Sequence, residues 1–403
     1  MNKNKITEYF AGIKSLLSRN AILIMCVNVL NSFGDQFKNS YRSLYVVKEV
    51  GISTSLFGSA LSIYLIATML TRTPAAMIID RKRNLLKYLV AGEFLLKSLC
   101  WFSFPLITNA SIMNVLFAID GVANAMCATT IPALLAMTID KRAIGSGYAI
   151  MQGIGNLISA NARSIGTALY DAKGMAVASK VAALIPFMAA ICVLLMKNEN
   201  YIGIGNADRN ANQSKQLLCY KMLPLALIAG IPMIMYHGES NYLQLHAADY
   251  GFEYLVPLSI ATSLDGIFTV AVGFLCDLVN PAIFAIIGLS GATLGSFLLS
   301  ISTNNATFVA AVCAYHATQF FGPVFRVIGM KIVSFKEQGT YSATMFMMND
   351  LVGIISNKII GVVAENNGYF AMWRMISICL LCSLIAFIIL DNTYLNRLRR
   401  NNS

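Results

Sequence analysis

Residues 369–391, YFAMWRMISICLLCSLIAFIILD, carry only Arg374 and the terminal Asp391 as charged side chains. About 20 consecutive apolar residues in a helix are enough to cross the hydrocarbon core of a bilayer. A helix is required because an open strand in lipid would leave its backbone hydrogen bonds unmet. This stretch therefore predicts a membrane-spanning helix, and the rest of the chain is compared with it.

Eleven further apolar runs, bounded by turn-forming residues, are also predicted to be membrane-spanning helices. They fall near 21–45, 54–78, 85–107, 111–136, 144–169, 176–196, 221–247, 253–276, 281–301, 305–332 and 340–364. The composition agrees, because 57% of the 403 residues are hydrophobic and only 12% are charged, whereas a soluble domain carries about 25% charged residues. We expect an all-α polytopic membrane protein with twelve transmembrane helices.

The polar segment 197–220, rich in Asn and Gly, separates the sixth run from the seventh. It predicts a cytoplasmic linker between an N-terminal six-helix half, 21–196, and a C-terminal half, 221–391. Residues 392–403 are then a cytoplasmic tail.

The first twenty residues form a separate segment. Apolar side chains recur there at helical spacing, at Ile6, Phe10, Ile13 and Leu17, with basic residues elsewhere. This pattern predicts an amphipathic helix on the inner membrane surface. A disordered leader is the alternative.

Basic residues gather in the loops of one side. They are Lys3, Lys5, Lys14, Arg19, Arg81, Lys82, Arg83, Lys87, Lys141, Arg142, Arg209, Lys215, Lys336, Arg397, Arg399 and Arg400. The opposite loops 107–111 and 302–306 carry no charge. The positive-inside rule then places both termini in the cytoplasm. It also accounts for the net charge of +11 without a nucleic-acid partner. We expect a multi-pass monomer in a bacterial inner membrane.

Two stretches of 30 residues echo each other, one from Gly145 to Gly174 and one from Gly339 to Gly368. The segment AMIID, which ends at Asp80 in the first half, is likewise similar to GFLCD, which ends at Asp277 in the second half. Internal duplication of six-helix halves is a recurrent transporter design, with the substrate site near the midplane between the halves.

The segment AMIIDRKRN, 76–84, lies between the second and third spans. Together with the two sets of six spans and the central polar segment, it resembles the major facilitator superfamily over essentially the whole chain. That family carries G-x-x-x-D-R-x-G-R-R at this place. Here Asp80 and Arg81 are kept, Ala76 replaces the first Gly and the second Gly is missing; the later copy keeps Gly273 and Asp277 without an Arg. The resemblance implies that this motif acts as a cytoplasmic latch between helices.

Two positions depart from the pattern of proton-coupled antiporters in that family. Phe117 stands where such members carry an Arg in span four, four residues before Gly121. Ser159 and Ala160 stand where they carry the last Gly and Pro of G-x-x-x-G-P in span five. Both differences weigh against a drug–proton antiporter.

The first span carries a polar stripe. Its members, at spacings of 3, 4, 3 and 4, are Asn28, Asn31, Asp35, Lys38 and Arg42. This spacing places all five on one helix face. Ionisable groups within spans are costly and persist mainly where they face a cavity or a partner. We expect the stripe to line water and Asp35, near its centre, to be the proton-coupling group. The alternative is a buried seam in which Asp35 pairs with Lys38.

Other polar side chains within spans complete the predicted substrate cavity. Those placed in it are Gln152, Asn156 and Arg163 in span five, His237, Asn241 and Gln244 in span seven, and Arg72, Asp120, Asp265, Gln319 and Asp350 elsewhere. Glu239, His316, Arg326 and Lys358 are further candidates. Glu93 and Lys97, four residues apart, are expected to pair with each other. Arg163 needs an acidic partner, for which Asp35 and Asp120 are open choices.

These features predict secondary active transport of a small polar or charged organic solute by alternating access, coupled to protons. Arg42, Arg72 and Arg163 could hold a carboxylate or phosphate. The sequence contains no P-loop, H-E-x-x-H or G-x-S-x-G, so we expect no enzyme activity, cofactor or metal. Efflux of amphiphilic compounds, lipid translocation and a transport-inactive receptor or interaction protein remain alternatives.

The topology can be tested by placing single cysteines in a variant whose native cysteines are replaced by serine. A reagent that cannot cross the membrane should label positions 108 and 304 from outside, because both lie in uncharged outer loops. It should not label positions 84 and 210. Labelling of position 210 from outside would contradict the predicted orientation.

Overall fold

The computed structural model describes residues 15–81, 86–138, 154–155, 157–197, 218–333 and 338–402. Every regular element within these ranges is a helix. The chain folds into two compact units. Unit 1 comprises Met1–Tyr45 and Ile63–Ala211, and unit 2 comprises Val46–Ser62 and Asn212–Ser403.

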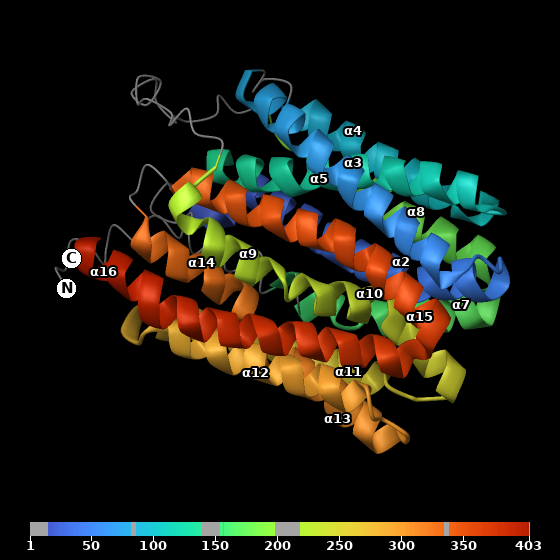
Figure 1. The fold of residues 1–403 in the computed structure, drawn as a ribbon. Coiled ribbons are helices and arrows are strands. Elements are labelled where there is room, and N and C mark those ends of the chain that lie inside the picture. The colour runs from blue at the N-terminus through green and yellow to red at the C-terminus, as the bar shows by residue number, and fades with distance from the viewer. Residues whose placement is uncertain are drawn as a thin grey trace. The chain divides into compact units, whose positions relative to one another are not determined.

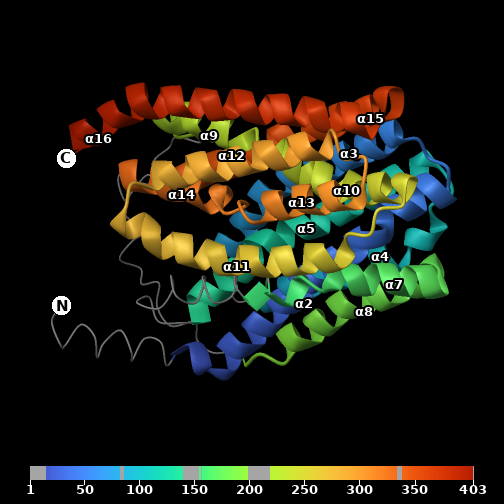
Figure 2. The ribbon, with the colours of Figure 1, turned by 90° about the horizontal axis from the view of Figure 1, so that it is seen from below.

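Within the described residues, unit 1 contains five helices of its own and most of a sixth, which it shares with unit 2. They are α2 (Arg19–Leu44), α3 (Thr54–Arg81) from Ile63 onward, α4 (Leu86–Phe102), α5 (Ala110–Thr138), α7 (Ala162–Lys173) and α8 (Met175–Leu194), with short turns η1 (Ser15–Leu17) and η4 (Phe104–Leu106). α2 packs against α7 and α8, which run beside it in Figure 2, and α4 packs against α5 and α8.

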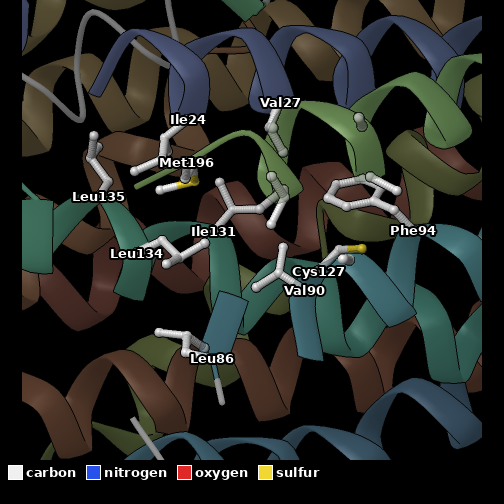
Figure 3. Close-up of a cluster of buried hydrophobic side chains, with 14 of the residues drawn as sticks. Ile24, Val27, Leu86, Val90, Phe94, Cys127, Ile131, Leu134, Leu135 and Met196 are labelled. Atoms are coloured by element: carbon white, nitrogen blue, oxygen red, sulfur yellow. The ribbon is translucent and has the colours of Figure 1, made fainter. Parts of the chain in front are cut away.

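The core of unit 1 is apolar and joins four of these helices. Figure 3 shows Ile24 and Val27 of α2 beside Val90 and Phe94 of α4, with Ile131 and its neighbours on α5 and Met196 after α8. All of these side chains are buried. The cluster fixes the positions of α2, α4 and α5, the three helices that carry Asp35, Lys38, Lys97 and Asp120.

Two glycines allow helices of unit 1 to approach closely. A Cβ at Gly166 of α7 would lie 2.4 Å from Ser40 Oγ and 2.5 Å from Phe37 O, both on α2. A Cβ at Gly121 of α5 would lie 2.2 Å from Tyr64 O on α3. Any larger side chain would push the helices apart at these points, so the glycines set the distance at which side chains from neighbouring helices meet.

Unit 2 contains the remaining helices. They are η2 (Tyr45–Glu49) from Val46 onward, the first part of α3, η7 (Tyr220–Met222), α9 (Leu223–Gly230), α10 (Met233–Tyr250), α11 (Leu255–Leu278), α12 (Pro281–Leu299), α13 (Asn305–His316), α14 (Phe321–Ile332), α15 (Gln338–Leu390), η9 (Asp391–Leu395) and α16 (Asn396–Asn402). α12 lies along α15 in Figure 1 and also packs against α13 and α14, while α15 packs against α9 and α10 and α11 packs against α13.

The predicted runs 221–247 and 305–332 are each broken into two helices. The run 221–247 changes from α9 to α10 at Ile231–Pro232, where proline supplies no N–H for the helical ladder. The run 305–332 changes from α13 to α14 at residues 317–320. In contrast, the runs 340–364 and 369–391 join in α15 through a bend at Gly368.

Gly368 has φ +80° and Gly174, which ends the other 30-residue repeat, has φ +74°. Their ψ values are 171° and 176°. Glycine adopts this backbone region without the steric penalty that a Cβ would bring. The two glycines that end the repeats therefore make the same kind of turn.

The segment 46–62 is tied into unit 2 by polar contacts. Thr54 Oγ1 donates to Gly361 O at 3.1 Å, the Ser55 N–H donates to Glu365 Oε2 at 2.8 Å, and Ser62 Oγ donates to Ile354 O at 2.7 Å. Lys48 forms an ion pair with Asp249 of α10. α3 is therefore a single helix whose beginning belongs to one unit and whose remainder belongs to the other.

Seven stretches of the described helices are long and apolar enough to cross a membrane. They are Thr54–Arg72, Met175–Leu194, Tyr220–Tyr250, Leu255–Gly273, Pro281–Leu299, Asn305–Ile332 and Ala343–Arg399. The last has 57 residues and includes the bend at Gly368, so it is long enough for two crossings of about 20 residues. α2 is not among them, since its polar stripe lowers its hydropathy. The number of twelve spans stays a prediction.

Candidate functional site

Asp120 of α5 lies at the centre of the charged side chains in unit 1. Its Oδ2 is 2.6 Å from Lys38 Nζ of α2, and its Oδ1 accepts a 2.8 Å hydrogen bond from Trp101 Nε1 of α4. The side chains of Lys38 and Asp120 are each 2% exposed. Both carboxylate oxygens are therefore occupied by donors from two different helices.

Asp35 of α2 is held by a second lysine. Lys97 Nζ of α4 lies 2.9 Å from Asp35 Oδ1 and donates a 2.7 Å hydrogen bond to Asn31 Oδ1. The two ammonium groups flank one indole, with Lys38 Nζ 4.6 Å and Lys97 Nζ 5.1 Å from the ring centroid of Trp101. Such cation–π contacts partly replace the lost hydration of a buried ammonium. We call the residues Asn31, Asp35, Lys38, Lys97, Trp101 and Asp120 the unit 1 charge cluster.

The pairing within this cluster differs from what the sequence predicted. The alternative seam, in which Asp35 pairs with Lys38, is not the pairing observed, because Lys38 contacts Asp120 and Asp35 contacts Lys97. Lys97, for which the sequence predicted Glu93 as the partner, contacts Asp35 and Asn31. Helical spacing predicts which side chains share a helix face. The interaction partner of each side chain depends on which helix packs against that face.

Water access is uneven along the polar stripe of α2. The side chain of Asp35 is 27% exposed, whereas that of Lys97 is 0% exposed. Asn28 and Asn31 are half-buried, and Lys38 and Arg42 are buried. Arg42 has its guanidinium carbon 5.0 Å from the ring centroid of Phe117. Lys38 is therefore enclosed by protein, and Asp35 is the acid of the cluster whose side chain is partly exposed.

Arg163 of α7 is buried and donates from Nε to Gln36 Oε1 at 2.7 Å. Its proposed acidic partners, Asp35 and Asp120, are each bound by a lysine. The sequence analysis missed Gln36 because it lies outside the polar stripe of α2. Its position next to Asp35 in the sequence could have marked it as a candidate. Arg72 of α3 is half-buried.

Unit 2 contains a second group of ionisable side chains, from three helices. His316 Nε2 of α13 lies 3.5 Å from Glu239 Oε1 of α10, and Asp265 of α11 interacts electrostatically with His316. Ser240 Oγ donates to Glu239 Oε2 at 3.2 Å and Thr269 Oγ1 donates to Asp265 Oδ1 at 3.4 Å. Glu239, Asp265 and His316 are all buried. We call these three residues the acid–histidine cluster.

Of this cluster, only Asp265 was placed in the predicted cavity. Glu239 and His316 were noted as candidates without a role. Glu239 lies off the helix face shared by His237, Asn241 and Gln244, so spacing alone did not select it. The residue types themselves, an acid and a histidine inside apolar spans, were the signal.

The other predicted cavity residues of unit 2 are buried or make local contacts. Asn241 Nδ2 donates to His237 O at 3.0 Å within α10, and Gln319 Nε2 donates to Tyr315 OH at 2.9 Å. Gln244 and Asp350 are buried. Gln152 and Asn156 lie outside the described residues, as do the side chains of Asp80, Arg81 and Asp277. Gly273 lies in α11 with open space beside it.

The ion pair of Lys38 with Asp120 gives a direct test of this arrangement. Asp120→Asn leaves a buried ammonium without its counter-charge, which should destabilise the folded protein by about 3–5 kcal/mol. The double variant Lys38→Met, Asp120→Leu removes both charges and should recover most of the loss. Thermal unfolding in detergent measures both effects.

The exposed pair of Lys48 with Asp249, 43% and 34% exposed, supplies the control. Lys48→Met should change stability by less than about 1 kcal/mol. An unfolding temperature of Asp120→Asn equal to that of the wild type would show that the buried pair does not form.

Solved structures share this fold. The nucleoside transporter NupG matches with a TM-score of 0.69 and 15% sequence identity, over 92% of this chain and 99% of that one. A bacterial homologue of the human lysosomal transporter Spinster, in an inward-facing and unoccupied conformation, matches with a TM-score of 0.72 and 10% identity, over 95% and 98% of the two chains. At these identities the likeness concerns the fold.

No curated protein matches the sequence. The sequence model of one family, however, does match, over residues 24–357. This range runs from α2 into α15 and includes the unit 1 charge cluster and the acid–histidine cluster. With its apolar membrane-spanning helices, the chain belongs to the Major Facilitator Superfamily.

Proposed function

We propose that the protein is a secondary active transporter. It moves a small polar or charged organic solute across a bacterial inner membrane by alternating access, using a proton gradient. The observation that carries this proposal is the unit 1 charge cluster, in which Lys38, Lys97 and Asp120 are ionisable and almost fully buried. Such groups are costly within a membrane and mark pathways for solutes or ions.

The solute is proposed to contact polar side chains from several helices. The cavity residues are Asn28, Asn31, Lys38, Arg42, Arg72, Asp120, Gln152, Asn156, Arg163, His237, Asn241, Gln244, Asp265, Gln319 and Asp350. Groups of both signs favour a polar or zwitterionic solute. The guanidinium of Arg163 would bind a carboxylate or phosphate in two-point fashion, while Gln36 holds its Nε.

Asp35 is the proposed coupling group because it combines solvent access with a fixed counter-charge. When Asp35 is ionised, Lys97 Nζ is held 2.9 Å away. When Asp35 takes up a proton, that attraction is lost and Lys97 keeps the Asn31 oxygen as an acceptor. Protonation would thus weaken the link between α2 and α4. A ligand or proton that binds one conformation better shifts the population toward it.

The latch is proposed from the motif alone. Asp80 and Arg81, with Gly273 and Asp277 in the second copy, would stabilise one access state from outside the solute cavity. Residues of this kind set the balance between states more than the affinity for solute.

Transport itself is tested in proteoliposomes with and without a pH gradient. The solutes should include organic anions, amino acids, sugars, dyes and, because of the fold shared with NupG, nucleosides. A small polar solute should accumulate only with the gradient. Accumulation of amphiphilic dyes alone would favour efflux of amphiphiles, movement of labelled lipid would favour lipid translocation, and no movement of any compound would favour a receptor.

Asp35→Asn is expected to separate coupling from exchange. A pH gradient of one unit supports about tenfold accumulation per coupled proton, and the variant should lose this accumulation because its side chain cannot titrate. Counterflow exchange of the solute should persist. A purely structural role of the Asp35–Lys97 pair would instead lower folded yield and abolish both activities. If the variant still concentrates solute, Asp35 is not the coupling group.

A further inference from the structure

We propose that Glu239, Asp265 and His316, the acid–histidine cluster, form a proton-binding site within unit 2. This site would be separate from Asp35. The inference rests on the proposed function for its consequence, a second proton taken up during transport, but proton binding itself can be measured without a solute.

The first observation is the state of His316. This imidazole is 3% exposed, and neither Nδ1 nor Nε2 makes a hydrogen bond to any residue that the structure describes. Buried polar side chains ordinarily have at least one such bond. Its Nε2 instead faces a carboxylate oxygen of Glu239 at 3.5 Å. A proton on His316 would convert this approach into a charge-assisted hydrogen bond after a small movement.

The second observation concerns Asp265. This carboxylate is 7% exposed, and within the described ranges it has no ion pair with a lysine or arginine. Its contacts are the long hydrogen bond from Thr269 and the electrostatic interaction with His316. In unit 1, by comparison, Asp35 and Asp120 each have an ammonium group within 3 Å. A buried carboxylate without such a partner is commonly neutralised by a proton.

The backbone around the cluster supports the same interpretation. His316 is the last residue of α13, directly before the break at 317–320, and Glu239 lies in α10, which begins after the break at Ile231–Pro232. In transporters, helices broken within the membrane commonly form the sites for substrates and coupling ions. Each of these two cluster residues therefore lies on a helix that is interrupted within its predicted span.

Further titratable groups lie on the helices that carry the cluster. Tyr236 and His237 lie on α10 and Tyr315 lies on α13; Tyr315 interacts electrostatically with Glu239, Tyr236 and Asp265. Groups this close titrate together, so the proton belongs to the cluster and not to one residue. An imidazole facing a carboxylate favours a proton over an alkali cation, because hard cations prefer oxygen ligands.

The test uses the full chain in lipid nanodiscs and the infrared C=O stretch of a protonated carboxylic acid. The wild type should show a buried carboxyl band that appears as the pH is lowered. This band should be lost or at least halved in Asp265→Asn and in Glu239→Gln. In His316→Gln its midpoint should move by about tenfold or more in proton concentration. Asp249→Asn, which alters an exposed acid of unit 2, should leave the band unchanged.

Labelling with ¹³C-aspartate keeps the test valid if Asp265→Asn does not fold, because the aspartate contributions to the band then shift in frequency and that of Glu239 does not; labelling the Asp35→Asn variant in the same way removes the contribution of Asp35. The proposal is overturned if the wild type has no titrating buried carboxyl band. It is also overturned if the band persists in both acid variants, or if it responds to sodium at constant pH. In transport assays, Asp265→Asn should lower the number of protons moved per solute by one. Absence of transport for every solute would contradict the proposed function and leave the infrared result standing.

Discussion

The carboxylate of Asp120 joins three helices of unit 1, because Lys38 of α2 and the indole of Trp101 from α4 both bind it. Removing charges from water is unfavourable, and the attraction between them offsets this only when every oxygen and ammonium finds a partner. Here each oxygen of Asp120 has a donor and each lysine has an acid within 3 Å. A buried pair of this kind adds little net stability, but it penalises any packing of α2, α4 and α5 that separates its members.

The two units satisfy this constraint differently. In unit 1 Asp35 and Asp120 are each matched by a lysine from another helix. In unit 2 the buried carboxylate of Glu239 faces the imidazole of His316, and an imidazole can carry a charge or lose it. The helices that carry Glu239 and His316 are also interrupted. One unit thus holds a paired network with Asp35 open to solvent, and the other holds a cluster whose charge depends on protons.

Similarity of fold at 10–15% identity tells little about these clusters. Folds of this class support many solutes, and the solute is selected by the side chains that line the path. The charged residues of this chain, and not its resemblance to a nucleoside transporter, are therefore the basis for proposing a polar or charged solute.

The membrane class and most helix positions follow from the order of amino acids without any knowledge of the packing. The runs predicted at 176–196 and 281–301 correspond to α8, Met175–Leu194, and α12, Pro281–Leu299. These predictions succeeded because the two requirements involved, an apolar surface and internally satisfied backbone hydrogen bonds, are met within one segment. The polar stripe of α2 was visible for the same reason.

The pairing of charges, in contrast, depends on how the helices pack. Lys38 and Asp120 are 82 residues apart, Lys97 and Asp35 are 62 apart, and no local pattern links them. Lys38, the nearest basic neighbour of Asp35 on its own helix, was a plausible partner, but it contacts Asp120 instead. The helix break after His316 and the proximity of His316 to Glu239 could not be predicted from the sequence either. A side chain's partner depends on which helix packs against its face and at what height, and that is set by the sum of contacts along whole helices.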